Sequence, residues 1–138
     1  MDTPCVQLAI LIDDNDIDLF VQKRFIEMNH FASNVITFLS PIDALNYLAK
    51  ANADGSPAGV IFLDLNMPVM DGFGFLESLL EIPGQVAERT KVVVLTSSSS
   101  SSDREKASTY KNVFNFISKP LSTQCLAELR EQIIHMPS

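Results

Sequence analysis

Five short apolar runs recur along the chain, and each is followed by a segment whose apolar residues have helical spacing. The runs cover Val6–Ile12 and residues 35–38, 59–63, 91–95 and 113–117. Their β-branched residues and weak alternation are typical of strands buried on both faces of a parallel sheet. Because strand and helix alternate five times, we predict an α/β fold with right-handed crossovers and helices on both faces of the sheet.

The first predicted helix follows an acidic turn. Apolar residues recur in it at helical spacing: Ile17, Phe20, Val21, Phe25 and Met28. Asp16 and Asp18 fall in the first turn of this helix, where the helix dipole favours anions. We therefore assign these two carboxylates to helix stabilisation and not to a metal site.

Caps and breakers mark other helices. Ser40, which precedes a proline, predicts the N-cap of the second helix, and residues 51–58 are expected to form the loop after it. A run of six serines follows the fourth strand and has two interpretations. It is either a flexible linker or an ordered loop, in which Ser102 and Glu105 form a capping box for a helix that starts near Asp103. We favour the ordered loop.

Composition limits the class of protein. The chain has 138 residues, of which 46% are hydrophobic and 20% charged, and this predicts one domain spanning residues 1–138. A net charge of −7 without a basic cluster argues against a nucleic-acid-binding face. No apolar run is long enough to cross a membrane, and the two cysteines fit no disulfide or metal pattern. We expect a cytoplasmic protein with reduced thiols.

Polar residues end four of the five predicted strands. Asp13 and Asp14 end the first, Asp64 the third, Thr96 the fourth, and Lys119, followed by a proline, the fifth. In open α/β sheets the ligand site lies beyond the carboxyl ends of the strands. Each residue alone has an ordinary explanation as a cap, turn or surface residue. Their coincidence at one edge predicts a site.

The residue types at this edge suit phosphoryl chemistry. Three converging carboxylates, Asp13, Asp14 and Asp64, repel one another unless a cation compensates, and an all-oxygen site suits Mg²⁺. A phosphoryl group there needs Lys119 to offset its charge and the Thr96 hydroxyl to donate to its oxygens. A carboxylate can act as the nucleophile and form an aspartyl phosphate, and the central Asp64 is the candidate.

The segment of residues 64–72, which reads Asp-Leu-Asn-Met-Pro-Val-Met-Asp-Gly, resembles the phosphorylation-site signature of response-regulator receiver domains of two-component signalling. The resemblance extends over the whole chain. It includes the acidic pair Asp13 and Asp14, Thr96, and Lys119 with its proline, all in the family's order. It implies a flavodoxin-like, doubly wound (βα)5 fold with strand order 2-1-3-4-5.

The resemblance also implies the reaction. A sensor histidine kinase or a histidine phosphotransfer protein would transfer a phosphoryl group from phosphohistidine to Asp64, with Mg²⁺, or Mn²⁺ in its place, as cofactor. The main-chain carbonyl of Asn66 would join Asp13, Asp14 and Asp64 as a metal ligand. Side chains at Asn66 and Ser98 would tune the phosphoryl lifetime. In this family the domain catalyses its own phosphorylation and slow dephosphorylation, and is not an enzyme in the usual sense.

The family's readout involves Thr96 and an aromatic residue three positions before the lysine. That residue is Phe116, which lacks the hydroxyl of the more frequent tyrosine. We give equal weight to two interpretations of Phe116, as a switch residue and as an ordinary core residue. Because the last helix ends close to residue 138, we expect no output domain. The output would pass to a downstream partner of unknown identity through the fourth helix, fifth strand and fifth helix.

Three alternatives remain. A small-molecule phosphatase that forms an aspartyl phosphate shares the nucleophile, Mg²⁺ and Lys, but needs a second acid where this chain has Asn66. A flavin carrier shares the fold but needs a phosphate-binding loop after the first strand, where Asp13 and Asp14 would repel the flavin phosphate. A degenerate receiver used only as a scaffold would not need the acidic and lysine set.

Overall fold

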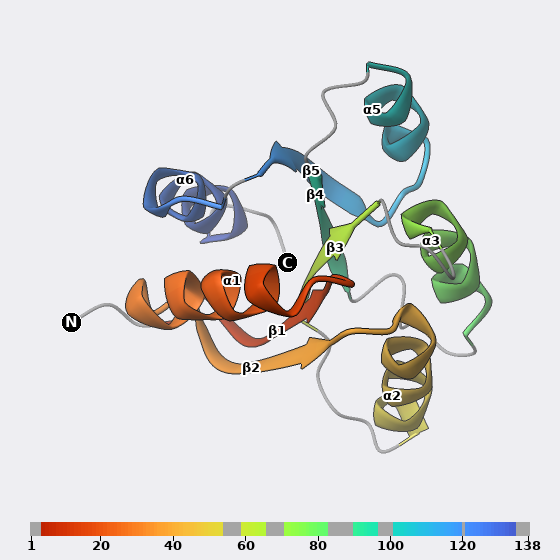
Figure 1. Ribbon diagram of the computed structural model, residues 1–138, viewed down its shortest axis with the longest axis horizontal. Coiled ribbons are helices and arrows are strands. Elements are labelled where there is room, and N and C mark those ends of the chain that lie inside the picture. Colours follow the sequence, from red (N-terminus) through yellow and green to blue (C-terminus); the bar gives the residue numbers. More distant parts are fainter. Residues whose placement is uncertain are drawn as a thin grey trace.

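The structure, a computed structural model, describes residues 4–53, 59–65, 71–82, 90–96, 101–119 and 121–134 (Figure 1). Strand and helix alternate through its whole length. The strands are β1 (Val6–Ile12), β2 (Ala32–Phe38), β3 (Val60–Asp64), β4 (Lys91–Thr96) and β5 (Val113–Ser118). The helices are α1 (Asp16–Met28), α2 (Pro41–Ala53), α3 (Gly72–Glu81), α5 (Ser101–Ser108) and α6 (Thr123–Ile134).

The five strands form one parallel sheet in the order β2-β1-β3-β4-β5. Helices cover both faces of it: α1 and α6 lie on one face, and α2, α3 and α5 on the other (Figure 1). Alternate residues of β1 serve the two cores, since Ile10 and Ile12 pack toward α2 and α3 whereas Ala9 and Leu11 pack toward α1 and α6. The predicted fold class and strand order are confirmed.

Several predicted boundaries shift. β2 begins at Ala32, three residues before the predicted start, and α2 continues to Ala53, so the loop predicted for residues 51–58 is wrong over its first three residues. The Ala-rich end of α2 has high helix propensity, which explains this extension. α5 begins at Ser101, so Ser102 lies inside the helix and not at its cap. The ordered helix after the serine run is confirmed, while residues 97–100 lie outside the described part.

α1 is a helix as predicted, but its buried face is not the one that its largest apolar residues suggested. The buried residues are Leu19, Gln22 and Ile26. Four of the five apolar residues used to predict the helix are instead exposed: Ile17, Phe20, Val21 and Met28. Apolar periodicity identified the helix correctly, but it could not tell which of two apolar faces meets the sheet.

The turn after β3 depends on a close backbone approach. Gly72, the first residue of α3, donates its backbone N–H to the Leu65 carbonyl at 2.9 Å, and a Cβ on Gly72 would lie 2.7 Å from the Leu65 Cα. Asp71 caps α3 by accepting a hydrogen bond from the Gly74 N–H at 2.9 Å. Only glycine fits at this contact, which fixes the chain next to Asp64.

No helix within the described ranges is both long and apolar enough to cross a bilayer.

Candidate functional site

The carboxyl ends of β1, β3, β4 and β5 bring the predicted site residues to one edge of the sheet. Asp64 pairs in register with Leu95, and Thr96 with Ser118, so neighbouring strands end at nearly the same level. The Lys119 N–H donates to the Thr96 carbonyl at 2.9 Å, which continues this alignment by one residue. Because a parallel sheet ends all its strands in one direction, residues distant in sequence meet here.

Three carboxylates converge at this edge. Asp13, Asp14 and Asp64 each offer an oxygen, and these oxygens lie within 4.8 Å of one another. Asp13 and Asp64 are only 1% and 6% exposed, whereas Asp14 is open to solvent. Hard oxygen donors with one open side fit a small divalent cation that keeps several waters, as Mg²⁺ does. The residues present therefore fit the metal that the sequence predicts.

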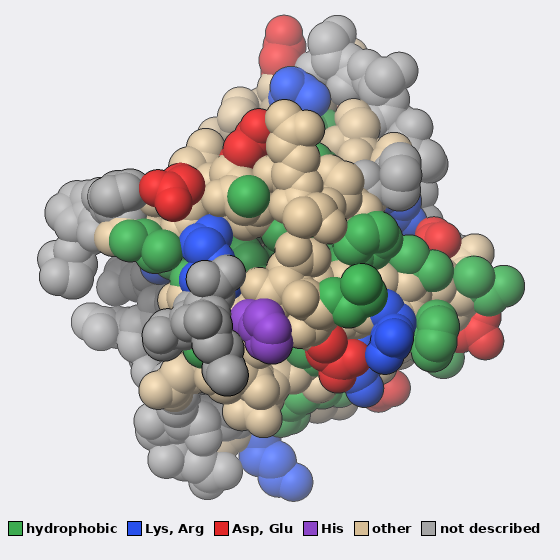
Figure 2. Space-filling model, turned by 90° about the vertical axis from the view of Figure 1, so that its left-hand side faces the viewer, with side chains coloured by type: hydrophobic (Ala, Val, Ile, Leu, Met, Phe, Trp, Pro, Cys, Tyr) green, Lys and Arg blue, Asp and Glu red, His purple; other side chains and the backbone are tan. Residues whose placement is uncertain are grey.

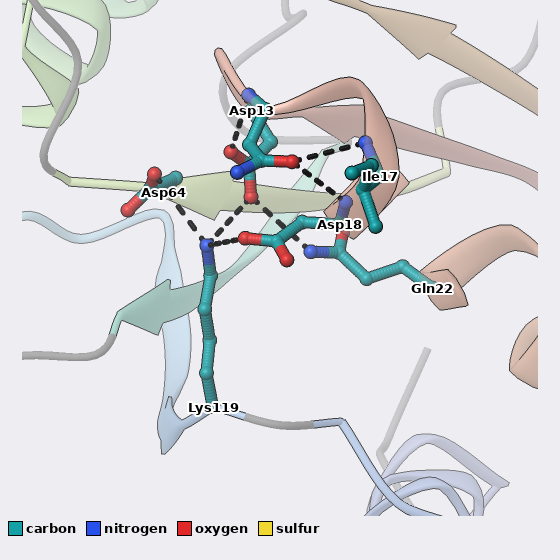
Figure 3. Close-up of polar contacts among 7 residues, drawn as sticks. Asp13, Ile17, Asp18, Gln22, Asp64 and Lys119 are labelled. Atoms are coloured by element: carbon teal, nitrogen blue, oxygen red, sulfur yellow. Dashed lines mark hydrogen bonds and ion pairs between the residues drawn. The ribbon is translucent and has the colours of Figure 1, made fainter. Parts of the chain in front are cut away.

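Lys119 lies among the carboxylates (Figure 3). Its Nζ is 2.7 Å from Asp13 Oδ2, 3.0 Å from Asp18 Oδ2 and 3.6 Å from Asp64 Oδ2. Burial by itself would lower the pKa of Lys119, but the hydrogen bonds to Asp13 and Asp18 and the charges of Asp13 and Asp64 raise it above the usual lysine range. The side chain is thus a fixed cation beside Asp64 at all physiological pH values.

Three hydrogen-bond donors fix the orientation of the Asp13 carboxylate. Its Oδ1 accepts the Asn15 N–H at 3.0 Å, and its Oδ2 accepts hydrogen bonds from Lys119 Nζ and from Gln22 Nε2, the latter at 3.2 Å. Asn15 also caps α1, because its Oδ1 accepts the N–H groups of residues 17 and 18. The turn that starts α1 therefore also holds the acidic pocket in shape.

Sequence reasoning missed two residues of this pocket. Asp18 was assigned to the helix dipole, yet its carboxylate accepts a hydrogen bond from Lys119. Gln22 received no role, although it is 5% exposed and donates to Asp13. A detectable signal did exist: Gln22 falls between Leu19 and Ile26 on the inner helical face, where a polar residue needs a buried partner.

The structure locates the other predicted residues less completely. Thr96 ends β4 and is fully buried at the same edge. Phe116 lies on β5, is partly buried against the core, and has the Arg104 guanidinium carbon 4.8 Å from its ring centre. Asn66 and Ser98, the predicted carbonyl ligand and lifetime residues, lie outside the described residues, as does the proline after Lys119.

Comparisons with known proteins agree with this geometry. Residues 9–131 match the family model described as response regulator receiver domain. The probable methanogenesis regulatory protein FilR2 of Methanothrix harundinacea is 30% identical over 131 residues, which cover 91% of this chain and 80% of that protein. A two component response regulator from Cytophaga hutchinsonii has a crystal structure with a TM-score of 0.86, 28% identity, and coverage of 94% of this chain and 98% of its own. A response regulator receiver protein from Dyadobacter fermentans gives a TM-score of 0.82, 31% identity, and coverage of 93% and 98%.

Proposed function

This chain belongs to the response regulator receiver domain family of two-component signalling, and from that premise we propose that Asp64 is its phosphoacceptor. The proposed donor is a phosphohistidine of a sensor histidine kinase or of a histidine phosphotransfer protein. One observation carries the proposal: Lys119 Nζ lies 3.6 Å from Asp64 Oδ2 at an edge where three carboxylates converge. A carboxylate nucleophile, a positively charged lysine and a site for a divalent metal ion are the components that phosphoryl transfer requires.

Asp13, Asp14, Asp64 and the Asn66 carbonyl would hold the metal, Mg²⁺ or in its place Mn²⁺. When bound, the metal would neutralise charge on the phosphoryl oxygens. Asp13 is suited to this because the Asn15 and Gln22 donors, which carry no charge, fix its carboxylate in advance. Pre-positioned ligands lower the entropic cost of binding a small ion.

In the proposed step an Asp64 carboxylate oxygen attacks phosphorus in line with the leaving nitrogen. The new P–O bond forms as the P–N bond breaks, and the imidazole nitrogen keeps the bonding electron pair. Lys119 would pair with a phosphoryl oxygen, and the Thr96 hydroxyl would donate to another. Because these groups all belong to this chain, we propose that it catalyses its own phosphorylation, including from small donors such as acetyl phosphate. Asn66 and Ser98 would then tune the slow hydrolysis.

The exposed face of α1 supports a protein as donor. Four large apolar residues on α1 are between 41% and 70% exposed: Ile17, Phe20, Val21 and Met28. Figure 2 shows hydrophobic side chains gathered on its right-hand side, with basic and acidic side chains among them. Exposed apolar patches of this kind commonly mark partner surfaces. α1 starts two residues after Asp14, so a partner on this face would border the acidic pocket.

We propose that phosphorylation is read through α5, β5 and α6 by a downstream protein. A pocket of about 150 Å³ lies between α5 and β5 and is lined in part by Arg104, Ala107 and Phe116. Arg104 stacks over the Phe116 ring, so a change in Phe116 packing would also move a charge on this surface. Equal affinity of a captured partner for the beryllofluoride-treated and untreated protein would contradict this part of the proposal.

The two cysteines, Cys5 and Cys125, are free, which fits the reducing cytoplasm that we propose as the compartment.

Intact-mass spectrometry after incubation with acetyl phosphate and MgCl2 tests the acceptor assignment. We expect one phosphoryl group per wild-type chain, none with excess EDTA, and none on Asp64→Asn. Asp16→Asn is the matched control, because it removes an exposed carboxylate from the same edge and should be labelled like the wild type. Labelling of Asp64→Asn would reject Asp64 as the acceptor. Rapid multiple turnover of a small phosphomonoester would instead favour the phosphatase.

Two variants test the donor surface. Phe20→Ser should slow transfer from a phosphorylated histidine phosphotransfer protein, while labelling by acetyl phosphate stays unchanged. Leu80→Ser, on α3, also removes an exposed apolar side chain and should leave both reactions unchanged. If Phe20→Ser left protein-to-protein transfer at the wild-type rate, the α1 face would not be the donor surface.

A further inference from the structure

Two polar side chains on α1 point into the acidic pocket without being metal ligands or the acceptor (Figure 3). Asp18 and Gln22 are four residues apart, so they lie one turn above each other on the same helical face. Asp18 Oδ2 accepts a hydrogen bond from Lys119 Nζ, and Gln22 Nε2 donates to Asp13 Oδ2. The helix thus holds both charges of the Lys119–Asp13 ion pair.

Gln22 occupies a position where an apolar residue would cost less. It is 5% exposed and lies between Leu19 and Ile26 on the buried face of α1. Burying an amide is unfavourable unless its hydrogen bonds are made, so packing alone favours leucine or methionine there. The hydrogen bond to Asp13 is the evident reason for a glutamine at this position. This hydrogen bond holds Asp13 Oδ2 in position even if Lys119 moves away.

Asp18 supplies Lys119 with a carboxylate that lies outside the metal-ligand set. Lys119 lies close to Asp13, at 2.7 Å, and a divalent cation would use that same carboxylate. Two cations that share one carboxylate repel each other, so Lys119 opposes metal binding as long as Asp13 is its main partner. Asp18, at 3.0 Å from Nζ and partly exposed, offers an alternative partner that is not one of the three clustered carboxylates.

We propose that Asp18 and Gln22 are positioning residues: Gln22 orients Asp13 toward the divalent cation, and Asp18 holds Lys119 beside Asp64 while that cation uses Asp13. This inference rests on the proposed function, because it assigns both residues to the same metal and phosphoryl site. Its consequence is that α1 sets the metal affinity of the pocket. A change in α1, such as a partner bound to its outer face, would then reach the acceptor directly.

Isothermal titration with MgCl2 tests both residues without any phosphoryl transfer. For Gln22→Met, and for Gln22→Leu as a second variant, we expect Mg²⁺ affinity to fall about tenfold, the loss typical when a residue that orients a metal ligand is removed. Circular dichroism checks that each variant is folded. Wild-type affinity in both folded variants would overturn the role of Gln22.

For Asp18 the comparison must separate positioning from loss of charge. Asp18→Asn should weaken Mg²⁺ binding at least fivefold more than Asp16→Asn, which removes an exposed charge from the same helical turn. Asp18→Glu should restore most of the affinity. In a Lys119→Met background the excess effect of Asp18→Asn should vanish, because Asp18 acts through Lys119. Equal effects of Asp18→Asn and Asp16→Asn, or an excess that persists without Lys119, would overturn the role of Asp18.

These outcomes are separate from those of the proposed function. If wild-type protein bound Mg²⁺ with the predicted variant effects but took no phosphoryl group from acetyl phosphate, the acceptor proposal would fail and the positioning inference would stand for the metal alone. If labelling of Asp64 occurred but the α1 variants bound Mg²⁺ like wild type, the positioning inference would fail and the acceptor proposal would stand.

Discussion

Replacing Lys119 with methionine should destabilise the metal-free protein and make it bind Mg²⁺ more tightly. Methionine keeps a long side chain but removes the ammonium that lies among Asp13, Asp18 and Asp64. Asp13 and Asp64 are nearly buried, so water cannot replace the lost cation well. The remaining carboxylates then repel one another unless a metal takes the place of the lysine.

The expected magnitude follows from the distances. At an effective dielectric constant of about 20, charges separated by 2.7 Å and 3.6 Å attract by about 6 and about 5 kcal/mol respectively. The desolvation of the lysine ammonium, several kcal/mol, offsets part of this sum. Removing one partner of a buried pair typically costs about 3–5 kcal/mol, and we expect Lys119→Met to fall at the lower end of that range because its side chain is 17% exposed.

Urea unfolding in EDTA and in saturating MgCl2 measures this effect. The loss of unfolding free energy should be about 3 kcal/mol in EDTA and clearly smaller in MgCl2, since a bound divalent cation restores the missing charge. Lys111→Met, at an exposed lysine, is the control and should change neither value. If Lys119→Met were as stable as the wild type in EDTA, or lost more stability in MgCl2, the electrostatic account of the pocket would be refuted.

Further predictions concern the scaffold. Phe75→Ala, on the fully buried face of α3, should lower the unfolding free energy by about 3–5 kcal/mol, whereas Leu80→Ala, 45% exposed, should cost about 1 kcal/mol or less in the same urea titration. Gly72→Ala should cost at least about 1 kcal/mol by the same measurement, because its Cβ would collide with Leu65. Burial raises the pKa of the Cys5 thiol, so the pH midpoint of its alkylation in a Cys125→Ser background should be higher in folded than in urea-unfolded protein; equal midpoints would contradict this.

Lys119 has a raised pKa in the folded state, so the sign of its pH effect is fixed. Its ammonium contributes full stability at any pH below the unfolded lysine value of about 10.4, and that contribution is lost only as pH rises above this value. Across neutral pH, titration of Lys119 should therefore add no pH dependence to the difference in unfolding free energy between wild type and Lys119→Met. Urea titrations above and below that pH check the direction.

The fold and the position of the site at one edge of the sheet could be predicted because their sequence signals are local. The five apolar runs predict the strands, and the polar residues that follow them mark one edge of the sheet. The parallel topology then brings Asp13, Asp64 and Lys119 together at that edge. Position along a strand is enough for this. No knowledge of side-chain contacts is needed.

The remaining features depend on contacts between elements, which periodicity does not contain. Asp18 is a normal first-turn acid by its position, and only the reach of Lys119 across the sheet edge gives it a second role. Likewise, both faces of α1 carry apolar residues, so the choice of Leu19, Gln22 and Ile26 as the buried face is made by packing against the sheet. The buried glutamine was the one available clue.

The central claim is that Asp64 carries the phosphoryl group, and chemical trapping of the modified residue tests it most directly. Acyl phosphates are reduced by borohydride to the alcohol, so protein treated with acetyl phosphate and MgCl2, then with borohydride, should yield a peptide with homoserine in place of Asp64. The same treatment in EDTA should leave that peptide unchanged. Homoserine at Asp13, Asp14 or Asp18, with Asp64 intact, would contradict the account.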